Sequence, residues 1–107
     1  MRSDMRTSNR LRFMMETAVK QANREILDPM IPELTAETIK PIVDATARMR
    51  GEYLMALFAV ADTVSSGNLS MSSVERLREL RVAYDELAHA FQALETAIER
   101  GYLTVKG

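Results

Sequence analysis

The strongest constraint on the fold is a run of large apolar residues in the last third of the chain, spaced alternately three and four positions apart. This spacing puts every member on one stripe of an α-helix and is typical of a helix that packs along another helix. Ser72 and Glu75 form a capping box before the run, and Gly101 follows it, so the pattern predicts a helix from Ser72 to Gly101. The stripe comprises Leu77, Leu80, Tyr84, Leu87, Phe91, Leu94 and Ile98.

An earlier helix is predicted from Ser8 or Asn9 to Leu27. It ends there because the residue before Pro29 is pushed out of the helical region. Residues 1–7 show no periodicity and are predicted to be a flexible end.

A middle helix follows a proline-containing connector and has two possible starts. Thr38 is a better cap than Thr35, because it leaves Pro41 in the first turn, where the missing N–H costs no hydrogen bond. The helix continues to Val64, and Gly67 offers a left-handed residue at its end.

These elements predict an all-α fold with two long antiparallel helices and a shorter N-terminal helix. With 107 residues there is room for a single helical domain, expected over residues 8–107. The apolar tail Tyr102–Val105 is expected either to fold back on the last helical turn or to form a short extended pairing.

The middle helix carries two apolar stripes when its residues are placed 100° apart. The first is the expected core face and contains Ile39, Ile42, Val43, Met49, Tyr53, Leu57, Val60 and Val64. The second is narrower and contains Ala47, Gly51, Leu54 and Phe58, with Met55 at its edge. Between Tyr53 and Ala61 the helix is apolar all round, so it requires cover on every side.

A second subunit or a protein partner would supply this cover, and we therefore expect a homodimer whose interface or partner site is the second stripe. The alternative is that the first helix covers the stripe within one chain. Both arrangements are compatible with the sequence.

The residues that carry catalytic chemistry are sparse. Glu86 and His89 match the Glu-x-x-His element of di-iron bundles, but the apolar stripe places them on the outward side of their helix, whereas such ligands project inward. His89 is the only histidine and there are no cysteines, so we expect no enzyme, no metal site and no cofactor.

Composition and charge argue against nucleic-acid-binding, secreted and membrane-spanning proteins. The net charge is −1, which gives no field to attract nucleic acid, and the arginines of the last helix alternate with acidic residues. The N-terminus lacks the apolar segment of a signal peptide, and the longest apolar run is far shorter than the roughly 20 residues that span a bilayer. A cytoplasmic protein without a membrane or nucleic-acid partner is expected.

The order of helix, proline connector, long helix EYLMALFAVADTVSSGN and capped helix SSVERLRELRVAYDELAHAFQALETAIERG resembles the QslA-like quorum-sensing antiactivators of bacteria. The resemblance covers most of the chain and contains no diagnostic motif. It implies a dimeric helical protein that binds a LuxR-type transcription regulator and keeps it from dimerising and binding DNA. The alternative function is a helical chaperone or adaptor that shields an apolar segment of a client protein.

Overall fold

The structure is a computed structural model. It describes residues 2–107, and it describes the burial of side chains for residues 4–107. The chain is all-α, as predicted. Its three helices are α1 (Arg2–Met30), α2 (Ala36–Ser65) and α3 (Met71–Glu99). The chain divides into two compact units: Ile39–Leu94, and the described part of Met1–Thr38 with Glu95–Gly107.

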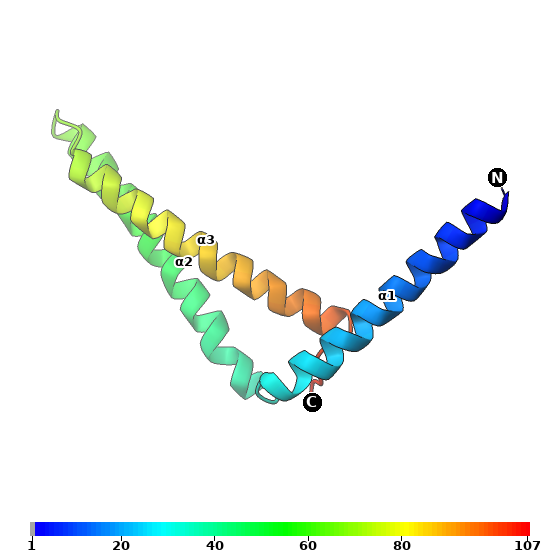
Figure 1. Cartoon of the computed structure of the whole chain (residues 1–107). Helices are drawn as coiled ribbons and strands as arrows, with labels where there is room; N and C mark the ends of the chain where they lie inside the picture. Colours follow the sequence, from blue (N-terminus) through cyan, green and yellow to red (C-terminus); the bar gives the residue numbers. More distant parts are fainter. Residues whose placement is uncertain (1) are drawn as a thin grey trace. The chain divides into compact units, whose positions relative to one another are not determined.

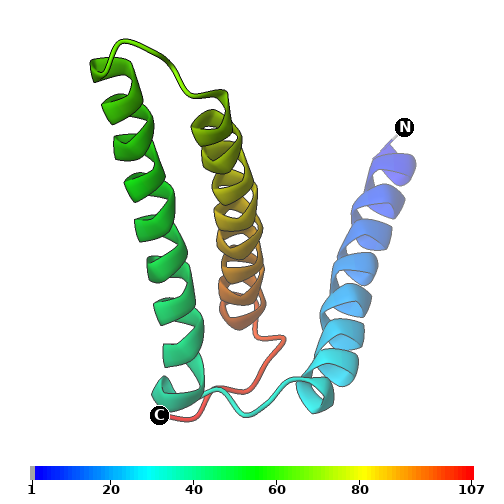
Figure 2. The ribbon, with the colours of Figure 1, turned by 90° about the vertical axis from the view of Figure 1, so that its left-hand side faces the viewer.

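The unit Ile39–Leu94 is an antiparallel hairpin of α2 and α3 (Figures 1 and 2). The two rings of Tyr53 and Tyr84 stack with their centroids 6.0 Å apart. Arg50 donates from Nε to the Tyr84 hydroxyl over 3.1 Å, and its guanidinium lies 5.4 Å from the centre of that ring. These contacts fix the register of one helix against the other, because the polar atoms find partners in this alignment.

The α3 stripe predicted from the sequence is confirmed as the covered face of that helix. Leu80 is buried with 7% of its surface exposed, and the other stripe residues are partly buried. The last of them, Ile98, belongs to the other unit.

The covered face of α2 agrees with the predicted core face in part. Ile39, Met49, Tyr53 and Val60 are partly buried, as expected. Ile42, Val43, Leu57 and Val64 were expected in the core but are 39–57% exposed. The covered positions again follow the three-four spacing and are Ile39, Thr46, Met49, Tyr53, Ala56, Val60 and Thr63. The large side chains of α3 thus share the space between the helices with several small residues of α2, as expected where facing positions interdigitate.

Both helices of the hairpin start earlier than predicted. Thr35, and not Thr38, caps α2: Thr35 Oγ1 accepts from the Thr38 backbone N–H over 3.2 Å, and Thr38 Oγ1 accepts from the Thr35 N–H over 2.8 Å. This reciprocal pair satisfies two terminal donors, and Pro41 then lies inside α2 beyond the first turn.

Ser70, and not Ser72, caps α3. Its hydroxyl accepts from the Ser73 N–H over 3.3 Å, so the predicted box with Glu75 is not the cap. The Ser70 N–H in turn donates to Thr63 Oγ1 over 3.3 Å, which ties this cap to the end of α2. Gly67 takes the predicted left-handed conformation, with φ +95°.

The other unit contains α1, the connector and the tail. Helix α1 begins at Arg2, so most of the segment predicted as a flexible end is helical in the structure. It also runs past Pro29 to Met30, because the Ile31 N–H reaches the Leu27 carbonyl over 3.0 Å and closes the last turn beyond the proline.

The tail forms the extended pairing that was one of its two predicted arrangements. Leu34 and Val105 form a parallel bridge, and the Lys106 N–H donates to the Leu34 carbonyl over 2.9 Å. Leu34 and Leu103 are 4% and 6% exposed and are the only buried residues of this unit among those whose burial is described.

Candidate functional site

The outward face of α2 is the surface that the sequence singled out as a binding site. We call it the α2 face; it comprises Ala47, Gly51, Leu54, Met55 and Phe58. All five residues are exposed in the structure. Four of them lie at successive intervals of four, three and four residues, so they form one row about 16 Å long at 1.5 Å rise per residue.

The three large side chains of the α2 face are open to solvent. Leu54, Met55 and Phe58 are 47%, 73% and 70% exposed. The adjoining Leu57 is 50% exposed. Removing such side chains from water stabilises a contact by roughly 1.5–3 kcal/mol each when burial is complete.

Small residues at one end of the α2 face leave its backbone accessible. A Cβ atom added at Gly51 would meet nothing within 4 Å. Ala47 is likewise exposed. Another helix can therefore approach closely at this end, while Leu54 and Phe58 provide bulk at the other.

Charges of both signs border the α2 face. Arg48 pairs with Glu52 over 4.0 Å, and Lys40 pairs with Asp44 over 2.7 Å, each one turn apart on α2. Because these pairs are exposed, each contributes little to stability, of the order of 0–1 kcal/mol. They give the apolar row a polar rim without a net field, as at many protein–protein contacts.

Two features of the surface were missed in the sequence analysis. Leu57 was assigned to the core, although it is exposed and lies three residues from Leu54, next to the α2 face. The second feature is an open pocket of about 960 Å³ in the α1 unit. Its apolar lining comes from Leu11, Met15 and Val19 of α1 together with Tyr102 of the tail. The intervals of four residues between Leu11, Met15 and Val19 place these side chains on one side of a helix, but nothing in the sequence pattern showed that Tyr102 lines the same pocket.

His89 lies on the exposed side of α3, where the sequence placed it. Its Nδ1 lies 2.7 Å from the backbone carbonyl of Asp85, one turn earlier. Glu86 is also exposed. Over residues 2–107, no three acidic, histidine or cysteine side chains gather in a way that would hold a metal ion.

None of the three helices, over their described lengths, has an apolar stretch that would cross a membrane. Comparison with protein-family models, with curated proteins and with solved structures finds no match.

Proposed function

We propose that this chain is a non-enzymatic regulator that acts by binding another protein through the α2 face. The observation that carries the proposal is the exposure of Leu54, Met55 and Phe58 on the side of α2 that faces away from α3. A large exposed apolar row with a polar rim is a common feature of protein-binding sites.

As the partner we propose a LuxR-type transcription regulator, which follows from the resemblance to QslA-like antiactivators. In this mechanism the α2 face occupies the apolar surface through which the regulator dimerises, so the regulator loses its affinity for DNA. The net charge of −1 supports an inhibitor that does not itself contact DNA. Such a partner also implies a cytoplasmic location.

A gel-shift titration tests this mechanism. Increasing amounts of the protein are added to a LuxR-type regulator bound to its DNA site, and the shifted band is expected to disappear as free DNA is released. A slower ternary band would contradict the mechanism, because the protein would then bind the regulator without displacing it. Direct retardation of DNA by the protein alone would also contradict it.

We also propose that the protein is a homodimer at micromolar concentration. The physical reason is that a helix with apolar residues on every side between Tyr53 and Ala61 needs more cover than one neighbouring helix provides. Analytical ultracentrifugation is expected to show a species of twice 12.1 kDa. A 12.1 kDa species alone at high concentration would refute the dimer.

Replacing His89 by alanine is expected to leave inhibition in the gel-shift titration unchanged, within about twofold. His89 is exposed and makes its hydrogen bond to a carbonyl of its own helix, so its loss removes no contact of the α2 face. A complete loss of inhibition with unchanged far-UV circular dichroism would show that the histidine has a chemical role.

A further inference from the structure

The C-terminal tail leaves α3 through a sharply defined turn. Gly101 has φ +75°, which favours glycine. Its N–H donates to the Ile98 carbonyl over 3.0 Å, and the Tyr102 N–H donates to the Ala97 carbonyl over 2.9 Å. This pair of bonds ends the helix and directs the tail away from its axis.

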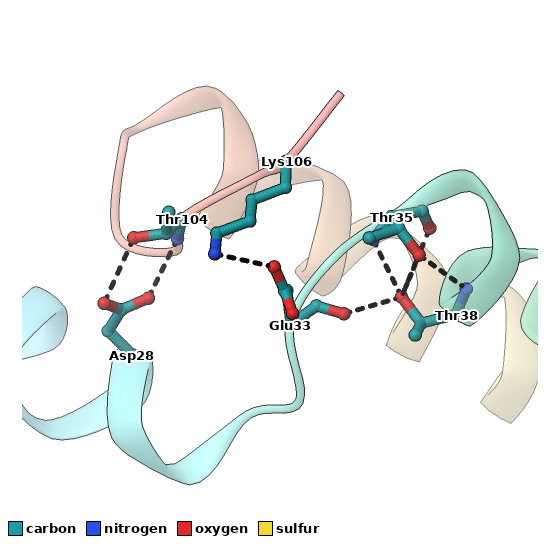
Figure 3. A network of polar contacts seen from close by, with 6 residues as sticks. All are labelled: Asp28, Glu33, Thr35, Thr38, Thr104 and Lys106. Carbon is teal, nitrogen blue, oxygen red and sulfur yellow. Dashed lines mark hydrogen bonds and ion pairs between the residues drawn. The ribbon is translucent and has the colours of Figure 1, made fainter.

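From there the tail is fastened to the end of α1 by polar contacts (Figure 3). Asp28 accepts two hydrogen bonds from Thr104, one from the backbone N–H at 2.9 Å and one from the hydroxyl at 3.1 Å. One turn earlier on α1, Arg24 donates to the Gly101 carbonyl over 2.8 Å. Two successive turns of α1 are therefore held by the tail.

The tail is also fastened to the connector that follows α1. Lys106 contributes twice, through its backbone bond to Leu34 and through an ion pair of 2.9 Å with Glu33. Leu103 is buried between these polar contacts along the tail. The attachment thus combines one buried apolar side chain with a row of bonds on either side.

Few side chains in the rest of α1 are buried by packing against other parts of its unit. Every residue from Asp4 to Ala22 is exposed, and only Asn23, Leu27 and Asp28 of the described helix are partly buried. The partly buried residues lie in the same turns as the contacts to the tail. The position of α1 within its unit therefore depends on the tail more than on helix packing.

We propose that residues 102–107 form a releasable clasp that fixes α1 and the connector and completes the α1 pocket. When the clasp is closed, Tyr102 lines the pocket opposite Leu11, Met15 and Val19. When it opens, α1 is freed at its connector and the pocket loses that wall. Any binding in the pocket is thereby made conditional on the state of the tail.

Release is possible because the clasp is at the end of the chain and most of its bonds are open to water. The side chains of Lys106 and Glu33 are 66% and 54% exposed, so water replaces their ion pair readily. Segments with few buried contacts open locally at lower free energy than the whole protein unfolds. Leu103 is the only fully buried residue of the tail, so its exposure to water is the main cost of opening.

Hydrogen exchange of the full chain, compared between two aspartate variants, tests the clasp. Leu103→Asp is expected to speed exchange of the amides of residues 24–35 by about tenfold or more, since a buried charge opens the tail. Amides of residues 77–94 in α3 are expected to keep their rates. Val105→Asp is the matched control: its side chain is 50% exposed, and it is expected to leave both segments unchanged.

Equally faster amide exchange of residues 77–94 in Leu103→Asp would overturn the proposal, because the tail would then open only when the whole protein unfolds. Unchanged rates of residues 24–35 would also overturn it.

A cycle of Asp28→Ala, Thr104→Ala and the double variant provides the second test. If the two residues act in one clasp, the amides of residues 24–35 exchange hydrogen no faster in the double variant than in the faster single variant, to within about twofold. Rate increases that multiply would overturn the proposal, since Asp28 and Thr104 would then act independently.

Discussion

Phe58→Asp is expected to abolish both self-association and binding of a LuxR-type regulator while the chain remains helical. Phe58 is 70% exposed, so an aspartate there is hydrated in the free protein and leaves the hairpin intact. In a complex the carboxylate would lose its water without gaining a partner charge, which costs several kcal/mol. We therefore expect the dissociation constant to rise by about two orders of magnitude or more, as measured by isothermal titration calorimetry.

Ala45→Asp is the matched control for this variant. It adds the same charge to the same helix at an exposed position, but about 140° further round the helix, outside the α2 face and outside the stretch from Tyr53 to Ala61. Normal binding by Ala45→Asp with loss of binding in Phe58→Asp would locate the contact on the α2 face. If Phe58→Asp binds and inhibits normally, the α2 face is ordinary surface and the proposed site is wrong.

Leu80→Ala is expected to lower the free energy of unfolding by about 2–5 kcal/mol, the typical cost of truncating a buried leucine. Leu80 is the only buried residue of the hairpin among those whose burial is described, and it is the second of the seven residues of the α3 stripe. Urea unfolding followed by circular dichroism measures the change, at one fixed protein concentration because dimerisation would add to stability.

Val82→Ala provides the comparison on the same helix. Val82 is 49% exposed, so its truncation is expected to change the free energy of unfolding by no more than about 0.5 kcal/mol. A similar loss of stability in the two variants would contradict the assignment of Leu80 to the helix–helix contact.

The α3 stripe could be predicted because its apolar residues follow one spacing without a competing pattern. On α2 the prediction was right for only half of the residues, because apolar residues surround the helix and periodicity alone does not rank their faces. Ile39, Met49, Tyr53 and Val60 lie on the covered side as expected. The rest of that side is formed by Thr46, Ala56 and Thr63, which the apolar pattern did not include. The two threonines satisfy their hydroxyls on the α2 backbone, at the carbonyls of Ile42 and Val60, so they lie on the covered face without unpaired groups.

The predicted start of α2 was wrong for a different reason. Thr35 and Thr38 are both good caps, and the choice of Thr38 rested on sparing Pro41 a lost hydrogen bond. In the structure Thr38 Oγ1 also donates to the Glu33 carbonyl over 2.8 Å, so the two threonines together satisfy more backbone groups than Thr38 would as the cap. Contacts between distant segments, such as Thr104 with Asp28, have no periodic signal and were not predictable.

The five predicted residues of the α2 face are all exposed, as a binding face requires. Leu57 extends the same surface and was missed because it was assigned to the core.

The contrast between the two hairpin helices has a consequence for how such a protein can change over generations. Helix α3 turns its largest side chains inward, whereas α2 keeps Leu54, Met55 and Phe58 outside. With the α2 face as the proposed binding surface, substitutions at these three exposed positions would change which protein is recognised and would leave the covered contacts between α2 and α3 intact. Substitutions that change the partner could therefore accumulate on one helix without loss of stability. In a protein whose recognition residues also form its core, each such substitution would lower the free energy of unfolding.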